Sequence, residues 1–73
     1  MDSSQVGRPL SPRVLKLPEV TERTGKKRSS IYRDIAAGVF PAPVKLGERA
    51  SGWLEHEINA WIAERIAARE RAA

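Results

Sequence analysis

Residues 24–33 of this 73-residue chain read Thr-Gly-Lys-Lys-Arg-Ser-Ser-Ile-Tyr-Arg, which combines a glycine, a basic cluster and short polar side chains. Lysine and arginine neutralise phosphates, and an arginine fork can also donate two hydrogen bonds to a guanine edge. A helix-turn-helix needs a sharp turn followed by a helix with one apolar and one polar face. The segment has these features in this order and therefore indicates contact with DNA.

Basic residues are concentrated in this part of the chain. From Arg23 to Arg33 there are five basic residues and no acidic one, whereas residues 54–73 contain three Arg and four Glu. The formal net charge is only +4, so the distribution of charge along the chain indicates more about a partner than the net charge does. A basic patch confined to one element favours a polyanionic partner, and a solvated surface without a partner is the alternative.

A short helix is expected before the turn, over residues 18–23. Pro18 is tolerated at a first helical position, and Glu19 complements the positive end of the helix dipole. Gly25 is expected to end this helix in a left-handed conformation. The side chains expected to face inward are those of Leu17, Val20 and Thr24.

A second helix is predicted over residues 28–37, because Gly38 would stop it. At 100° per residue, Ile35 lies within about 40° of Ile31, while Ser29 and Arg33 lie about 160° away. The two isoleucines are therefore expected to pack, and the opposite face is expected to meet solvent or a ligand.

Prolines and alternating side chains predict a β-hairpin after the second helix. Val44 and Leu46 are expected inward and Lys45 outward, residues 47–49 are expected to form the turn, and residues 50–53 the returning strand. A hairpin directly after a helix-turn-helix is a wing. A last helix is predicted over about residues 55–69.

The last helix is expected to cover the core with one apolar face. Its face consists of Leu54, Ile58, Trp61, Ile62, Arg65 and Ile66. In so small a protein, Trp53 and Trp61 are expected to serve as core volume rather than to stack on nucleobases. The fold class is thus mainly α with a small β-hairpin: a winged helix-turn-helix with three helices plus a wing.

Several function classes find no support in the composition. The chain has no Cys and one His, His56, so no metal site is expected. The sequence shows no nucleophile or paired carboxylate that could act with His56 in catalysis, so neither an enzyme nor a cofactor is expected. No apolar run is long enough for a membrane span, and the first residues do not resemble a signal peptide. A soluble, cytoplasmic protein is expected.

The domain organisation predicted from composition is simple. Residues 1–13, which carry Arg8 and Arg13, are expected to form a flexible arm, residues 14–70 the DNA-binding domain, and residues 71–73 a frayed end. A basic arm can enter a minor groove, but a plain disordered tail is the favoured interpretation.

The expected DNA contacts divide into three groups. Arg33 is the candidate for a bidentate contact to guanine, and Ser29 or Ser30 can reach a base edge or a phosphate. The residues expected to hold the phosphate backbone are Lys26, Lys27, Arg28 and the hydroxyl of Tyr32. On the wing, Lys45 and Arg49 are expected to touch flanking phosphates or the adjacent minor groove.

The chain resembles the AlpA family of prophage regulators, a branch of the MerR-like winged helix proteins that also includes many phage excisionases. The residues that carry the resemblance are Leu17, Glu19, Val20, Thr24, Gly25, 28–33, Gly38, Phe40, Pro41, 43–47, Arg49, Trp53, Glu57, Ile58, Trp61 and Ile62. The resemblance implies a DNA-binding protein of a phage or integrated element that controls transcription of an integrase gene or assists excision.

Two departures from the family pattern stand out. The family usually has an apolar residue and then a Ser where this chain has Lys26 and Lys27, so an apolar anchor and an N-cap are missing. Gly52 replaces the larger residues that often precede the tryptophan.

The sequence predicts a sequence-specific, double-stranded-DNA-binding transcriptional regulator and leaves two alternatives open. One is an excisionase that bends DNA and directs an integrase. The other is a protein-interaction module that uses the basic face and the last helix. A module of this size covers about a half-site, so tight binding would require a dimer or a cooperative array.

Overall fold

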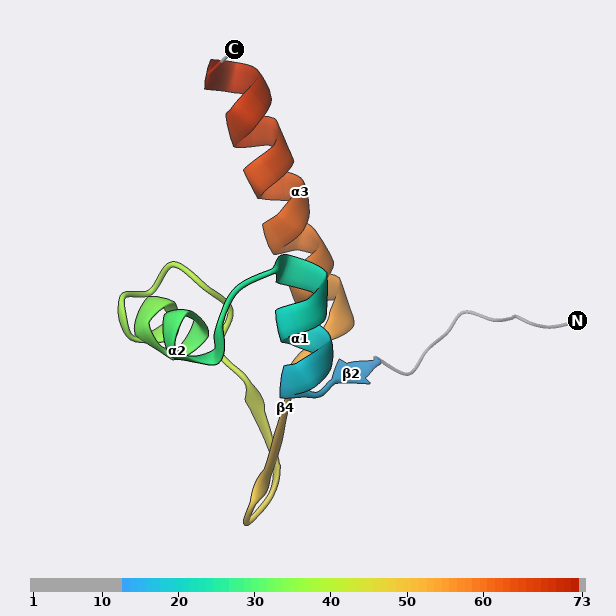
Figure 1. Cartoon of the computed structure of the whole chain (residues 1–73). Coiled ribbons are helices and arrows are strands. Elements are labelled where there is room, and N and C mark those ends of the chain that lie inside the picture. The colour runs from blue at the N-terminus through green and yellow to red at the C-terminus, as the bar shows by residue number, and fades with distance from the viewer. Residues whose placement is uncertain (1–12, 73) are drawn as a thin grey trace, which may run out of the picture.

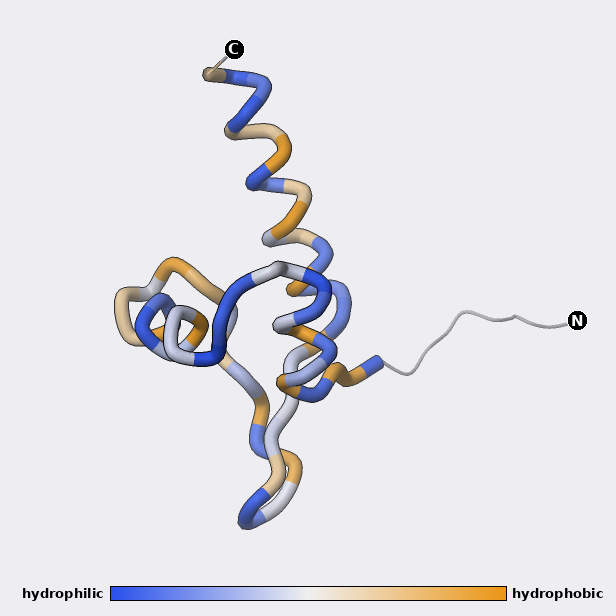
Figure 2. The backbone as a smooth tube through the Cα atoms, viewed as in Figure 1, coloured by the Kyte–Doolittle hydropathy of each residue, from blue (hydrophilic) through white to orange (hydrophobic). Residues whose placement is uncertain are grey.

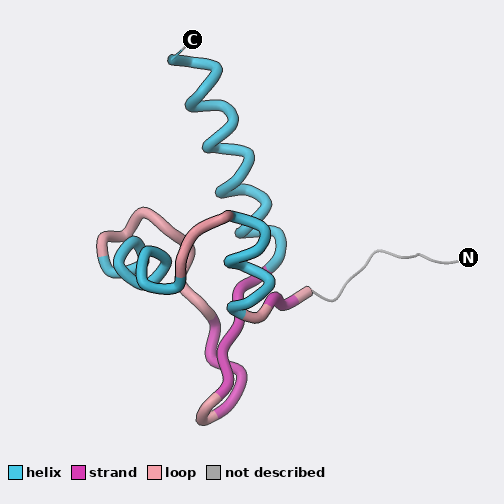
Figure 3. Tube along the Cα trace, in the orientation of Figure 1, coloured by secondary structure: helices cyan, strands magenta, loops and turns pink. Residues whose placement is uncertain are grey.

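Three helices and a small antiparallel sheet make up residues 13–72, the part of the chain that this computed structural model describes (Figure 1; Figure 3). The order of the elements is β2 (Val14–Leu15), α1 (Leu17–Thr24), α2 (Arg28–Ala36), β3 (Val44–Gly47), β4 (Ala50–Leu54) and α3 (Glu55–Ala72). The predicted class, mainly helical with a hairpin, is confirmed. The expected arm, including Arg8, lies outside the described residues, apart from Arg13.

Two glycines end the first two helices as predicted. Gly25 has a φ of 73°, and its amide donates to the Thr21 carbonyl oxygen at 2.8 Å. Gly38 has a φ of 78° and follows α2. Because a left-handed backbone is unfavourable for residues with a Cβ, both glycines set the points at which the chain turns.

The central strand of the sheet is β4, which pairs antiparallel with β3 on one side and with β2 on the other. The hairpin was expected, whereas β2 was expected only as an extended lead-in. Gly52 permits the additional pairing, because a Cβ there would overlap Val14 Cγ1 and lie 3.0 Å from the Leu15 carbonyl oxygen. The departure at Gly52 thus has a structural reason in this chain.

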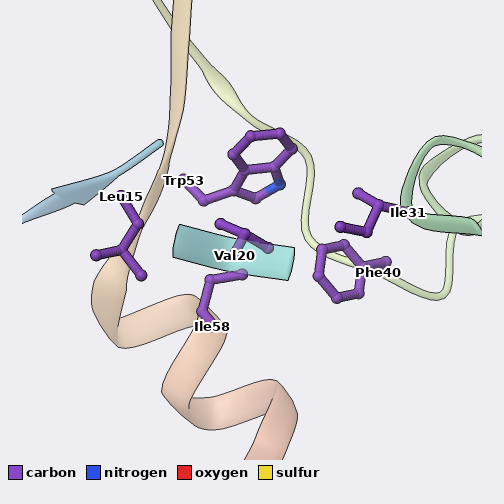
Figure 4. Close-up of a cluster of buried hydrophobic side chains, with 6 residues drawn as sticks. All are labelled: Leu15, Val20, Ile31, Phe40, Trp53 and Ile58. Atoms are coloured by element: carbon purple, nitrogen blue, oxygen red, sulfur yellow. The ribbon is translucent and has the colours of Figure 1, made fainter. Parts of the chain in front are cut away.

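Side chains from every helix meet in one core (Figure 4). Its buried residues are Leu15, Val20, Ile31, Phe40, Trp53 and Ile58. Ile35, Trp61 and Ile62 are partly buried against it, together with Leu17. The indole N–H of Trp53 donates to the Pro41 carbonyl oxygen at 2.9 Å, so this ring is both packed and hydrogen-bonded, as expected of core volume.

Charged side chains join α1, α3 and Arg13, the residue before β2, on the surface of this core. The Glu55 carboxylate lies 3.0 Å from Arg23 and 3.4 Å from Arg13, and Arg13 also approaches Glu19 at 3.6 Å. Arg23 reaches Asn59 at 3.4 Å as well. Arg13 therefore belongs to the folded framework, although it was expected on the arm.

Two apolar side chains that were expected to face inward are exposed. Leu46 is 47% exposed because the hairpin extends past the core, and Ile66 is 47% exposed because the second half of α3 projects from the body (Figure 1). The helix also continues to Ala72, beyond the predicted end near residue 69. Within residues 13–72, no helix combines the length and apolar character needed to cross a membrane.

Candidate nucleic-acid interface

The turn between α1 and α2 is closed by local hydrogen bonds. The Thr24 hydroxyl donates to the Val20 carbonyl oxygen at 2.7 Å and accepts from the Lys26 amide at 3.2 Å. Together with the left-handed Gly25, these bonds fix the direction in which α2 leaves the turn. The orientation of α2 is therefore set by the conformation of Gly25 and by the Thr24 side chain.

The two faces of α2 are divided as the helical projection predicts. Ile31 is fully buried and Ile35 partly buried, whereas Ser29 and Arg33 are exposed. Ser30 is intermediate, so it lies at the border of the outer face. The outer face therefore presents a short hydroxyl and a guanidinium to any ligand that approaches α2.

The first turn of α2 has no side-chain cap. Lys27 is the N-cap residue, and its side chain accepts no hydrogen bond from the helix. The amide of Ile31 is the first to bond back, to the Lys27 carbonyl oxygen at 2.9 Å. The preceding amides and the helix dipole favour an anion at this end. Lys27 and Arg28 are both exposed beside it.

Tyr32 links the outer face of α2 to the core. Its ring lies 6.4 Å from the ring of Trp53, tilted by 58°, and the Arg28 guanidinium lies 5.9 Å from the centre of the Tyr32 ring. Tyr32 is 45% exposed, so the ring contacts both the core and solvent. Cation–π attraction thereby holds Arg28 beside the start of α2.

Lys26 has surroundings unlike those of its neighbour Lys27. Its ammonium nitrogen lies 2.6 Å from Asp34 Oδ2, and the side chain is only 20% exposed. The same nitrogen is 5.5 Å from the centre of the Trp61 ring and 6.0 Å from that of Phe40. The Lys26 stem thus occupies apolar surroundings where the family pattern has an apolar residue, with its charge paired at the tip.

Asp34 was absent from the residues predicted to form the site. The hydrogen bond from Lys26 is the main cause that lowers the pKa of this carboxyl group, and Arg33 contributes in the same direction. A sequence signal for the pairing exists, since Asp34 lies about 60° from Ile31 in helical projection, on the inner side of α2. An acidic side chain there requires a cationic partner.

The hairpin carries a second group of cations. Lys45 on β3 and Arg49 in the turn are both exposed, and the Lys45 ammonium donates to the Glu48 carbonyl oxygen at 3.3 Å. Figure 2 shows hydrophilic residues at the turn before α2 and at the tip of the hairpin. The predicted site residues therefore form two groups, one on α2 with the turn before it and one on the hairpin, both away from the projecting end of α3 (Figure 1).

Comparisons with known proteins match the folded part of the chain. The family model described as Prophage CP4-57 regulatory protein (AlpA) matches residues 13–66. The DNA-binding transcriptional activator AlpA of Escherichia coli (strain K12) is 36% identical over 59 residues, which cover 73% of this chain and 84% of that protein.

A second relative is an uncharacterized protein, ORF88, of Enterobacteria phage P4. It is 48% identical over 59 residues, which cover 81% of this chain and 67% of that protein. No solved structure gives a significant match. The family match begins at Arg13 and ends within α3, so it includes both helices of the helix-turn-helix and the hairpin. This chain belongs to the AlpA family of prophage regulatory proteins.

Proposed function

We propose that the protein is a sequence-specific DNA-binding transcriptional regulator of a phage or integrated element. The observation that carries the proposal is the outer face of α2, where exposed cations and hydroxyls surround an uncapped helix start directly after a tight turn. A relative of 36% identity is a DNA-binding transcriptional activator by name, which supports the same function.

In the proposed complex, α2 lies in the major groove. Arg33 donates to a guanine edge, and Ser29 or Ser30 meets a base edge or a phosphate. The phosphate backbone is held by Lys27, Arg28, the Tyr32 hydroxyl and the first amides of α2. Lys45 and Arg49 on the hairpin contact flanking phosphates or the adjacent minor groove. Lys26 is left out of this set because Asp34 already neutralises it.

Selection of bound sequences from random duplex DNA tests the proposal. The wild-type protein is expected to enrich one motif that contains a guanine, and the number and spacing of its half-sites will report whether a dimer or an array binds. Arg33→Ala is expected to weaken binding to that motif by about 1–3 kcal/mol and to relax the preference at the guanine.

The same experiment separates DNA binding from a protein-interaction module. If no motif is enriched and the protein binds every duplex equally weakly, sequence-specific DNA binding is wrong. Arg69→Ala is a suitable control, because Arg69 is an exposed arginine on the projecting end of α3. Its replacement is expected to leave both the motif and the affinity unchanged.

A further inference from the structure

Asp34 is the only acidic residue between Glu22 and Glu48, and it stands beside the exposed cations of α2. Its two carboxylate oxygens have different partners. Oδ2 lies 2.6 Å from the Lys26 ammonium, and Oδ1 accepts from Arg33 Nε at 3.4 Å. A carboxylate next to a DNA-binding face would ordinarily repel phosphate and weaken DNA binding. The contacts of Asp34 indicate what it contributes there instead.

The contact with Asp34 uses only one of the three nitrogens of the Arg33 guanidinium. Within residues 13–72 the two terminal nitrogens have no protein partner, and the Arg33 side chain is 73% exposed. Because the guanidinium is planar and rigid, a bond at Nε restricts where the terminal nitrogens point. Those nitrogens form the fork that binds O6 and N7 of a guanine.

Lys26 gives Asp34 a defined position. The Asp34 side chain is only 19% exposed, and Lys26 reaches it from the turn while lying over the Trp61 and Phe40 rings. This hydrogen bond also lowers the pKa of Asp34, because it favours the ionised form of the carboxyl group. The chain of contacts therefore runs from the core through Lys26 and Asp34 to the exposed fork of Arg33.

We propose that Asp34 is a positioning residue for base recognition: anchored by Lys26, it holds the Arg33 guanidinium with its two terminal nitrogens free for a guanine. This inference rests on the proposed function, in which Arg33 contacts that base. It adds a specificity-determining role for Asp34 and an anchoring role for Lys26, neither of which requires contact with DNA.

Asp34→Ala, which removes both carboxylate oxygens, tests the inference because charge and positioning predict changes in different quantities. If Asp34 acts only through its charge, its removal should strengthen binding to all DNA by a similar factor. If it positions Arg33, the ratio of affinities for the selected site and for the same site with the guanine replaced should fall by roughly 3- to 10-fold. Glu22→Ala, the same charge change at an exposed site on α1, should leave this ratio unchanged.

Two further variants separate positioning from damage to the fold. In an Arg33→Ala background, Asp34→Ala should not lower the ratio further, whereas a general distortion of α2 would. Lys26→Gln should lower the ratio in the same direction but by less, and it provides the test if Asp34→Ala does not fold. Circular dichroism at the binding temperature establishes that each variant is folded.

The outcomes distinguish this inference from the function on which it rests. If Arg33→Ala lowers the ratio and the folded Asp34→Ala protein keeps the wild-type ratio, the positioning role is wrong while the proposed function stands. A drop caused by Asp34→Ala that persists in the Arg33→Ala background would also overturn it. If Arg33→Ala itself leaves the ratio unchanged, direct recognition by Arg33 is wrong, and the role of Asp34 falls with it.

Discussion

Arg13 and Arg23, in the framework around β2, α1 and α3, differ from Lys27 and Arg28, at the start of α2, in what they contact. Arg13 and Arg23 share the Glu55 carboxylate, at 3.4 and 3.0 Å. By contrast, Lys27 and Arg28 have no ion-pair partner among residues 13–72 and lie exposed at the start of α2. Ion pairing thus distinguishes these two framework arginines from the two cations at the start of α2.

Two adjacent lysines also differ in this way: one is ion-paired and the other is exposed. Lys26 points toward Asp34 and the Trp61 ring, whereas Lys27 is exposed at the helix start. One therefore belongs to the framework by its contacts and the other to the candidate interface. Substitutions that damage one region while leaving the other intact provide tests of this division.

Ile58→Ala should have the largest effect on the framework. Ile58 is fully buried, and removing a buried isoleucine side chain costs about 2–5 kcal/mol of unfolding free energy, a large share of the stability of a small domain. Ile66→Ala on the same helix is the matched control, because Ile66 is 47% exposed and the expected cost is about 0.5 kcal/mol. Urea unfolding followed by circular dichroism measures both, and equal costs would contradict the assigned core.

Gly52→Ala should have the next largest effect. The added Cβ would overlap Val14 Cγ1 and crowd the Leu15 carbonyl oxygen, so β2 must move at a cost of about 1–3 kcal/mol. At Gly47 the nearest contact to an added Cβ is 3.9 Å, so Gly47→Ala should change the free energy of unfolding by only about 0.5 kcal/mol. Thermal unfolding compares the two, and a fully stable Gly52→Ala protein would argue against the pairing of β2 with β4.

Replacing each of the adjacent lysines by Ala tests whether the two have different roles. Lys27→Ala should make the slope of log K against log salt shallower by about 0.9 while leaving the melting temperature unchanged, because one phosphate contact is lost. Lys26→Ala should instead lower the melting temperature and leave the slope unchanged. Salt titrations of DNA binding together with thermal melts separate the two cases. The division between the lysines would be wrong if both changed the slope equally.

The smallest expected effect is a dependence of stability on pH through Asp34. Because folding lowers the pKa of this group below its ordinary value of 3.8, its contribution is full above that value and is lost as the pH falls through the lowered pKa. The difference in unfolding free energy between wild type and Asp34→Asn should therefore be largest at neutral pH and shrink below pH 3.8. A difference independent of pH would contradict the ionised pair with Lys26.

The features that were predictable from sequence depend on local physics. Gly25 and Gly38 mark helix ends because of their backbone freedom, and the spacing of Ile31 and Ile35 sets the buried face of α2. The hairpin follows from alternation and turn residues. Each of these signals acts within a few residues and does not depend on tertiary contacts.

The features that were missed depend on contacts between distant residues. The strand β2 has two residues, and its pairing with β4 brings Leu15 next to Trp53, which no local pattern encodes. Lys26 resembles a phosphate contact in sequence, and only the fold brings it to Asp34 and the Trp61 ring. The exposure of Leu46 likewise depends on how far the hairpin extends past the core.

A nuclear magnetic resonance titration of the isotope-labelled protein with its selected DNA duplex tests whether α2 is the DNA-binding helix. The expected result is that chemical-shift changes concentrate in residues 27–33 of the α2 region and residues 45–49 of the hairpin. Residues 63–72, on the projecting half of α3, should be unaffected by the duplex. Changes concentrated on α3 with none at the start of α2 would contradict the assignment of α2 as the DNA-binding helix.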